Sequence, residues 1–113
     1  MNRISIEQDH ILKAASELWG KSFQKGMAIE ECSELILSLR HYDRDRVKIT
    51  KVLEEVADVL IVCRQIVLDH MLDKDVIDED GEQYTSEAFV HNTIEYKMSR
   101  LQDRVMTDNI NGG

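Results

Sequence analysis

The segment AIEECSELILSL, residues 28–39, decides the fold, because its apolar residues recur at the spacing of one face of an α-helix. Three acidic residues, Glu30, Glu31 and Glu34, interrupt this apolar pattern. A second segment, EEVADVLIV at residues 54–62, also sets acidic residues into an apolar helical pattern. Carboxylates are costly to bury without a partner, so two such segments in one small protein predict a chemical role for the acids.

Working outward, four segments have helical spacing and none has a sustained strand-like alternation, which predicts an all-α protein. The chain has no proline, and its few glycines leave long stretches uninterrupted. The predicted helices cover residues 5–19, 22–42 or 24–42, 47–72 and 86–107. The acidic segment at residues 73–85 is predicted to be a loop. We expect a four-helix bundle-like subunit in which residues 1–113 form a single domain.

Each predicted helix has an apolar stripe for packing. On the first helix this stripe consists of Ile11, Ala15, Leu18 and Trp19. The C-terminal half of the third helix is apolar around more than one face, which predicts that a second copy of the chain covers it. We therefore expect a homodimer or a homotetramer, and a charge placed at Ile66 or Leu68 should impair assembly.

The composition limits the classes of partner. The chain of 113 residues is 42% hydrophobic but only 5% aromatic, which predicts one domain with a mostly aliphatic core. Its 14 basic and 22 acidic residues give a formal net charge of −8. This charge argues against a nucleic-acid or membrane partner. A nucleotide held through a metal ion is still compatible, because the cation reverses the local sign of charge.

The compartment is predicted from the cysteines and the N-terminus. Cys32 and Cys63 fall in apolar helical patterns, which predicts two buried free thiols in a reducing cytoplasm. The N-terminal residues MNRISIEQDH lack the apolar centre of a signal peptide. The longest apolar run, residues 59–63, is too short to span a bilayer. We therefore expect a soluble cytoplasmic protein.

The acidic residues occupy defined positions around their helices, since each helical residue advances by about 100°. Glu55 falls inside the apolar stripe of the third helix, and Asp58 flanks it three residues later. Glu31 and Glu34 are neighbours at the edge of the buried face of the second helix. Glu30 and Glu54, which come directly before Glu31 and Glu55, point away from the buried face. Two i, i+3 pairs of carboxylates are thus available to face each other.

A buried Glu55 needs a partner, and the pattern favours a metal ion. Arg40 and Arg64 do not share the face of Glu31 or Glu55. Antiparallel packing of the second and third helices would place the two pairs of acids opposite each other. Magnesium or manganese favours such oxygen ligands. No glutamate of these two acidic segments is followed three residues later by histidine, as di-iron bundles require, so magnesium is favoured over iron.

The fourth predicted helix adds positive charge. Lys97 lies in the middle of its apolar face, and Arg104 lies close to the same azimuth two turns later. One interpretation is a snorkelling lysine, whose stem packs while its ammonium group reaches water. The other is a contact with a bound phosphate, which a cation near an acidic metal site would suit.

The pattern Glu30-Glu31-x-x-Glu34 followed by Glu55-x-x-Asp58 resembles the signature of the MazG-like all-α nucleoside triphosphate pyrophosphohydrolases, which are related to dimeric dUTPases and dCTP pyrophosphatases. The stretches QKGMAIEECSEL, VLEEVADVLI and YKMSRLQDR carry the likeness, which extends over about the whole chain. The resemblance implies magnesium-dependent hydrolysis of (deoxy)nucleoside triphosphates to the monophosphate and pyrophosphate. Such a hydrolase of phosphoric anhydrides would serve nucleotide-pool house-cleaning.

The resemblance also implies roles for individual residues. The implied metal ligands and catalytic residues are Glu31, Glu34, Glu55 and Asp58. Lys97 would contact the phosphates, and Lys97 or Arg104 would stabilise the departing pyrophosphate. Gln24 and Trp19 match positions near the base or sugar. Glu34 and Glu30 are both candidates for the base that takes the proton from the attacking water.

Two other functions are compatible with the same pattern. A catalytically silent sensor would bind metal or nucleotide at the same site without turnover. A helical interaction module would carry its acids only as solvated surface groups, although the buried azimuth of Glu55 argues against this.

Overall fold

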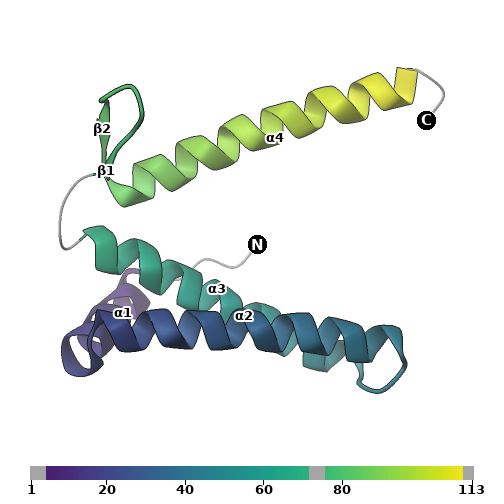
Figure 1. Cartoon of the computed structure of the whole chain (residues 1–113), viewed down its shortest axis with the longest axis horizontal. Coiled ribbons are helices and arrows are strands. Elements are labelled where there is room, and N and C mark those ends of the chain that lie inside the picture. Colours follow the sequence, from purple (N-terminus) through teal and green to yellow (C-terminus); the bar gives the residue numbers. More distant parts are fainter. Residues whose placement is uncertain (1–4, 72–75, 111–113) are drawn as a thin grey trace. The chain divides into compact units, whose positions relative to one another are not determined.

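The structure, a computed structural model, describes residues 5–71 and 76–110. Within these residues it contains four helices and one short hairpin (Figure 1), which confirms the predicted all-α class. Contacts divide the chain into two compact units, Met1–Asp73 and Lys74–Gly113, and each is described by itself. The bundle-like arrangement and the single domain over residues 1–113 stay predictions.

Helix α1, Ile6–Trp19, begins at a capping box. The Ser5 hydroxyl accepts a hydrogen bond from the Gln8 backbone N–H at 3.1 Å, and the Gln8 side chain accepts one from the Ser5 N–H at 2.7 Å. This reciprocal pair satisfies two of the N–H groups that a helix start leaves free. Gly20 ends the helix with a φ of 89°, a conformation that favours glycine. The predicted bounds of this helix are confirmed.

The packed face of α1 is not the predicted one. Ile11, Leu18 and Trp19, which the apolar stripe placed inside, are more than half exposed. The buried residue is Ser16, and Ala15 beside it is half-buried. The physical reason is a polar contact with α3, which the spacing of apolar residues does not record.

This contact is a buried hydrogen-bond network that joins α1 to α3. The Ser16 hydroxyl donates to the Asp69 carboxylate and accepts from the Gln65 amide. The same amide donates to the Leu12 carbonyl at 2.8 Å and to Asp69 at 3.0 Å. Because the three side chains are buried and mutually bonded, the network fixes α1 against α3.

An ion pair supports the same packing nearer the start of α1. Arg64 donates to both carboxylate oxygens of Asp9, at 3.0 and 2.7 Å. The hydrogen bond from Arg64 lowers the pKa of Asp9 below its ordinary value. Arg64 is therefore engaged with α1, in agreement with the prediction that it does not serve the face of Glu55.

Helices α2, Lys21–Asp43, and α3, Ile49–Met71, pack side by side as an antiparallel pair (Figure 1). The chain turns between them at residues 44–48, close to the predicted bounds, and the predicted end at Leu72 lies outside the described residues. The buried hydrophobic residues of the described chain are all aliphatic, as predicted: Ala28, Val52, Val62 and Leu68. Leu68 is only 2% exposed, so the expectation that it lies on an assembly surface is wrong.

In the second unit, the predicted loop contains a β-hairpin. Strand β1, Val76–Ile77, pairs antiparallel with β2, Gln83–Tyr84. The Asp78 carboxylate holds the turn by accepting from the Asp80 and Glu82 backbone N–H groups, both at 2.9 Å. Strands of two residues are too short to show alternation in the sequence, which explains the wrong prediction.

Helix α4, Ser86–Ile110, follows the hairpin and extends slightly beyond its predicted end. The rings of Tyr84 and Phe89 meet edge to face, with centroids 6.0 Å apart, and join the hairpin to the first turns of α4. The unit is thus one long helix with a hairpin at its N-terminal end.

Two predictions concern the surface of the chain. Cys32 and Cys63 are free, as predicted, but both are exposed, so their predicted burial is wrong. Burial still raises the pKa of the Cys63 thiol, and the nearby Cys32 raises it further. Among the described residues, none of the helices combines the length and hydropathy that crossing a bilayer requires.

Candidate metal centre

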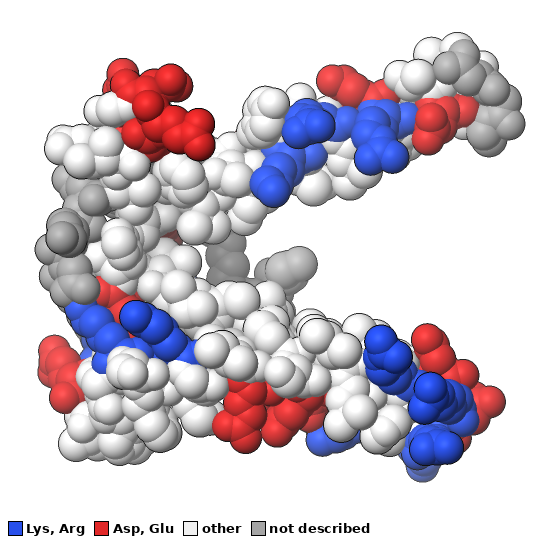
Figure 2. Space-filling model, viewed as in Figure 1, with Lys and Arg blue, Asp and Glu red and all other residues white. Residues whose placement is uncertain are grey.

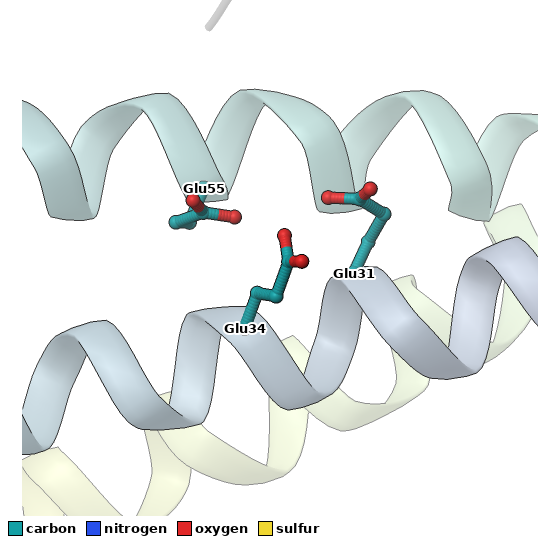
Figure 3. Close-up of side chains that lie close together, drawn as sticks. All are labelled: Glu31, Glu34 and Glu55. Atoms are coloured by element: carbon teal, nitrogen blue, oxygen red, sulfur yellow. The ribbon is translucent and has the colours of Figure 1, made fainter.

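The contact between α2 and α3 brings three of the predicted carboxylates together. Glu31 and Glu34 lie one turn apart on α2 and point toward α3, where Glu55 points back toward them (Figure 3). Each contributes a carboxylate oxygen, and these oxygens all lie within 4.8 Å of one another. We call Glu31, Glu34 and Glu55 the carboxylate cluster.

Glu55 is the most buried member of the cluster, at 4% exposed, as its position in the apolar stripe predicted. Its Oε1 forms an ion pair with the Lys51 ammonium group, 2.8 Å away. Its Oε2 is buried and has no hydrogen-bond partner among the described residues. A buried, charged oxygen without a hydrogen bond or a positive charge beside it is energetically costly.

Glu31 has a similar uncompensated oxygen. It is half-buried, and its Oε2 is also buried without a hydrogen-bond partner in the described part of the chain. Burial raises the pKa of Glu31 above its ordinary value, and the negative charges of Glu34, Asp58 and Glu55 raise it further. A positive charge beside Glu31 would oppose this shift.

The other predicted acids surround the cluster. Asp58 is exposed on α3, and its carboxylate lies close enough to Glu31 to raise the pKa of that residue. It is not one of the three residues whose oxygens converge. Glu30 and Glu54 are exposed, as their azimuths predicted.

The donor set fits a hard divalent cation. Magnesium binds oxygen at about 2.1 Å, so two ligand oxygens on opposite sides of the ion lie about 4.2 Å apart. Adjacent ligand oxygens of an octahedral ion lie about 3.0 Å apart, and the cluster oxygens, within 4.8 Å of one another, are near this range. The unpartnered oxygens of Glu31 and Glu55 are the ones that a cation would satisfy. The identity of the ion as magnesium stays a prediction.

A pocket of about 280 Å³ adjoins the cluster on the side of Glu31 and Asp58. Two residues that the sequence placed near a base or sugar line it, the buried Gln24 and the exposed Trp19. Phe23, whose ring centroid is 6.1 Å from that of Trp19, also lines it and was not predicted. The other lining residues are Leu12, Ala15, Met27, Ile61, Val62 and Gln65. Apolar walls that also carry two carboxylates and two buried amides suit a small ligand with one flat apolar part.

A second pocket, of about 260 Å³, adjoins the cluster on the side of Glu34 and Glu55. Lys51 lines it and is the residue that sequence reasoning missed. Only arginines were considered as partners of Glu55. The i, i+4 spacing of Lys51 and Glu55 was a sufficient signal, because residues at this spacing face each other on a helix.

The predicted cations Lys97 and Arg104 lie on α4, in the second unit, and are exposed. With Arg100 and Leu101 they line a depression of about 170 Å³ on that helix. Figure 2 shows basic side chains gathered along α4. Arg100 lies over the Tyr96 ring, 5.7 Å from its centroid, so Lys97 and Arg104 are the cations of this group without an aromatic contact among the described residues.

Comparison of the chain with protein-family models, with curated proteins and with solved structures found no match. The geometry of the carboxylate cluster and the residue pattern of the sequence are the features that indicate its function.

Proposed function

We propose that the chain is a magnesium-dependent nucleoside triphosphate pyrophosphohydrolase of the MazG type, acting on the cytoplasmic nucleotide pool. One observation carries the proposal: carboxylates from two helices converge within 4.8 Å, and two of their buried oxygens lack hydrogen-bond partners among the described residues. Natural proteins rarely leave such oxygens without compensation unless an ion or ligand supplies it. The resemblance of the acidic pattern to the MazG-like signature supplies the reaction class.

The carboxylate cluster and Asp58 would hold the metal. A bound magnesium ion supplies charge neutralisation for the triphosphate and a lowered pKa for water that attacks the α-phosphorus. Glu34 is the exposed member of the cluster, and therefore has room to accept a proton from that water. Glu30 is the other candidate for this base, and its side chain is also exposed to solvent.

The substrate would use the pocket beside Glu31. Its apolar walls fit a nucleobase, with the Trp19 ring at the mouth and the Gln24 amide as a hydrogen-bonding group inside. The phosphates would then lie at the carboxylate end of the pocket. The resemblance to the MazG-like family, and not a placement beside this pocket, is the basis for proposing Lys97 and Arg104 as phosphate contacts that stabilise the departing pyrophosphate.

Product analysis tests the reaction. The protein is incubated with magnesium and each of the common and damaged nucleoside triphosphates, and the products are separated by ion-exchange chromatography. We expect monophosphate and pyrophosphate in equal amounts, because attack at the α-phosphorus breaks the α–β anhydride bond. Diphosphate with inorganic phosphate would contradict the proposed bond cleavage. Metal-dependent stabilisation without products would favour the silent sensor, and neither effect would favour the interaction module.

We also propose that the chain assembles into a homodimer or homotetramer. Many large apolar side chains of the described helices are exposed, among them Ile66 on α3 at 48%, and soluble monomers rarely expose large apolar patches. We expect light scattering to give a multiple of the 13.1 kDa chain mass. Ile66→Glu should lower this mass, whereas His70→Glu, at an exposed polar position of the same helix, should not. A monomer mass for the unmodified chain at micromolar concentration would contradict the proposal.

A further inference from the structure

We propose that Lys51 is a tethered counter-ion of the carboxylate cluster, which a divalent cation displaces from Glu55, so that Lys51 sets how tightly the cluster binds metal. The inference rests on the metal-binding part of the proposed function. It adds a residue that belongs to no part of the predicted site.

The two partners of this ion pair differ sharply in burial. The Glu55 side chain is 5% exposed and the Lys51 side chain is 52% exposed, while their charged atoms lie 2.8 Å apart. The carboxylate is fixed within the contact of α2 and α3, but the ammonium group reaches it from the surface. The lysine can therefore return to solvent at little cost, whereas Glu55 cannot.

The pKa of Lys51 is affected by other nearby acids as well as by its direct partner, Glu55. The hydrogen bond and the charge of Glu55 raise the pKa of Lys51, and the charges of Glu54 and Glu34 add to this. Its ammonium group lies 2.8 Å from the Glu55 carboxylate. It already neutralises part of the negative charge that would attract a metal ion.

A metal ion and the Lys51 ammonium group compete for the same carboxylate. A magnesium ion bound to Glu55 would lie about 2.1 Å from its oxygen, and the ammonium nitrogen lies 2.8 Å from Oε1. Two cations at such distances from one carboxylate repel each other strongly. The pocket of about 260 Å³ beside Lys51, which Ser38, His41 and Val47 also line, gives the side chain room to move away.

This competition has two opposite consequences for the protein. Without metal, Lys51 stabilises the fold, because it is the ion-pair partner of a buried carboxylate. When a metal ion binds, the ion pair must break, and this lowers the net free energy that metal binding releases. Removal of the Lys51 charge should therefore weaken the metal-free fold and strengthen metal binding.

The test uses Lys51→Gln in the full chain, with Mg²⁺ alone as the probe. Glutamine retains a hydrogen-bond donor for Glu55 but lacks the charge. We expect isothermal titration calorimetry to give a dissociation constant for Mg²⁺ about tenfold lower than that of the unmodified chain. We also expect a lower melting temperature without metal and a larger rise in melting temperature on adding Mg²⁺.

Two further variants separate the ion pair from general electrostatics. Lys48→Gln removes the same charge just before α3, from an exposed lysine that makes no ion pair with the described residues. It should change the dissociation constant by less than about twofold, because solvent and salt screen an exposed charge. Lys51→Arg keeps the competing charge and should bind Mg²⁺ about as tightly as the unmodified chain.

Several outcomes would overturn the inference. Equal or weaker Mg²⁺ binding by Lys51→Gln would show that Lys51 does not compete, and an equal gain in Lys48→Gln would show that only net charge matters. If Lys51→Gln is unfolded without metal, refolding on addition of Mg²⁺ supports the inference, and failure to refold at saturating Mg²⁺ overturns it. Absence of Mg²⁺ binding by every variant and by the unmodified chain would remove the metal site itself, and the inference with it.

Discussion

Replacing Glu55 by glutamine is expected to abolish magnesium-dependent turnover and the magnesium-dependent rise in melting temperature together. The change removes the most buried carboxylate of the cluster, whose Oε2 has no hydrogen-bond partner in the described chain. We expect kcat/KM to fall by about 10³-fold or more, beyond the 10–100-fold typical of residues that only support a metal ligand. Steady-state kinetics and thermal unfolding with and without Mg²⁺ measure the two effects.

The fold should survive this substitution. Glutamine has nearly the same shape as glutamate, and it removes a buried charge that only Lys51 compensates in the described chain. Lys51, whose side chain is half exposed, is left free to be solvated. Circular dichroism should therefore show an unchanged helical content without metal.

Glu54→Gln is the matched control. Glu54 precedes Glu55, carries the same charge and is exposed, so both variants change the net charge of the chain equally. We expect Glu54→Gln to keep turnover within about twofold, as for surface substitutions away from a site. Full magnesium-dependent activity in Glu55→Gln would remove the cluster as a metal site, and equal losses in both variants would point to net charge instead.

The same periodicity that makes Glu55 identifiable also predicted the all-α class and the four helices of the described residues. Apolar residues at helical spacing predicted the bounds of α1 to within a residue. Those signals are local, so the sequence carries them in full. Antiparallel packing of α2 and α3 was the assumption that set the two pairs of acids opposite each other, and these helices do pack side by side in that way.

The polar contacts between helices could not be predicted in this way. Ser16, Gln65 and Asp69 form a buried network, but in the sequence each is an ordinary polar residue on a helix. Ser16 lies 53 positions from Asp69 and 49 positions from Gln65, and no periodicity connects it to them. This is why the apolar stripe of α1 gave the wrong packed face.

The carboxylate cluster was predictable because its geometry follows from two helix azimuths and one antiparallel contact. Glu31 and Glu34 are one turn apart on α2, and Glu55 is the acid of α3 that lies within an apolar stripe. The ion pair with Lys51 was equally local but was missed, since only arginines were weighed as partners. Asp58 was predicted as an equal ligand, but the structure leaves it beside Glu31 and outside the three converging oxygens.

Replacing Lys97 by methionine is expected to lower kcat/KM by about 10²-fold or more while leaving the fold intact. Methionine keeps much of the apolar stem and deletes the charge, and Lys97 is exposed on α4, so little packing is lost. The reduction follows from the proposed contact with the triphosphate, because the loss of one charge-stabilising donor costs about 10²–10³-fold in catalysis. Metal binding without nucleotide should be unchanged, since the carboxylates that would hold the metal are Glu31, Glu34 and Glu55, and none of them is on α4.

Arg100→Met is the matched comparison for this prediction. Arg100 lines the same depression of α4 as Lys97, but its guanidinium group lies over the Tyr96 ring, so its charge is already engaged. A loss confined to Lys97→Met would indicate a direct contact with the phosphates. Equal losses in both variants would show that α4 acts through its summed positive charge, and such an effect should fade as salt is raised. Unmodified kinetics in Lys97→Met would leave Lys97 as a snorkelling lysine, and the triphosphate would need another cation.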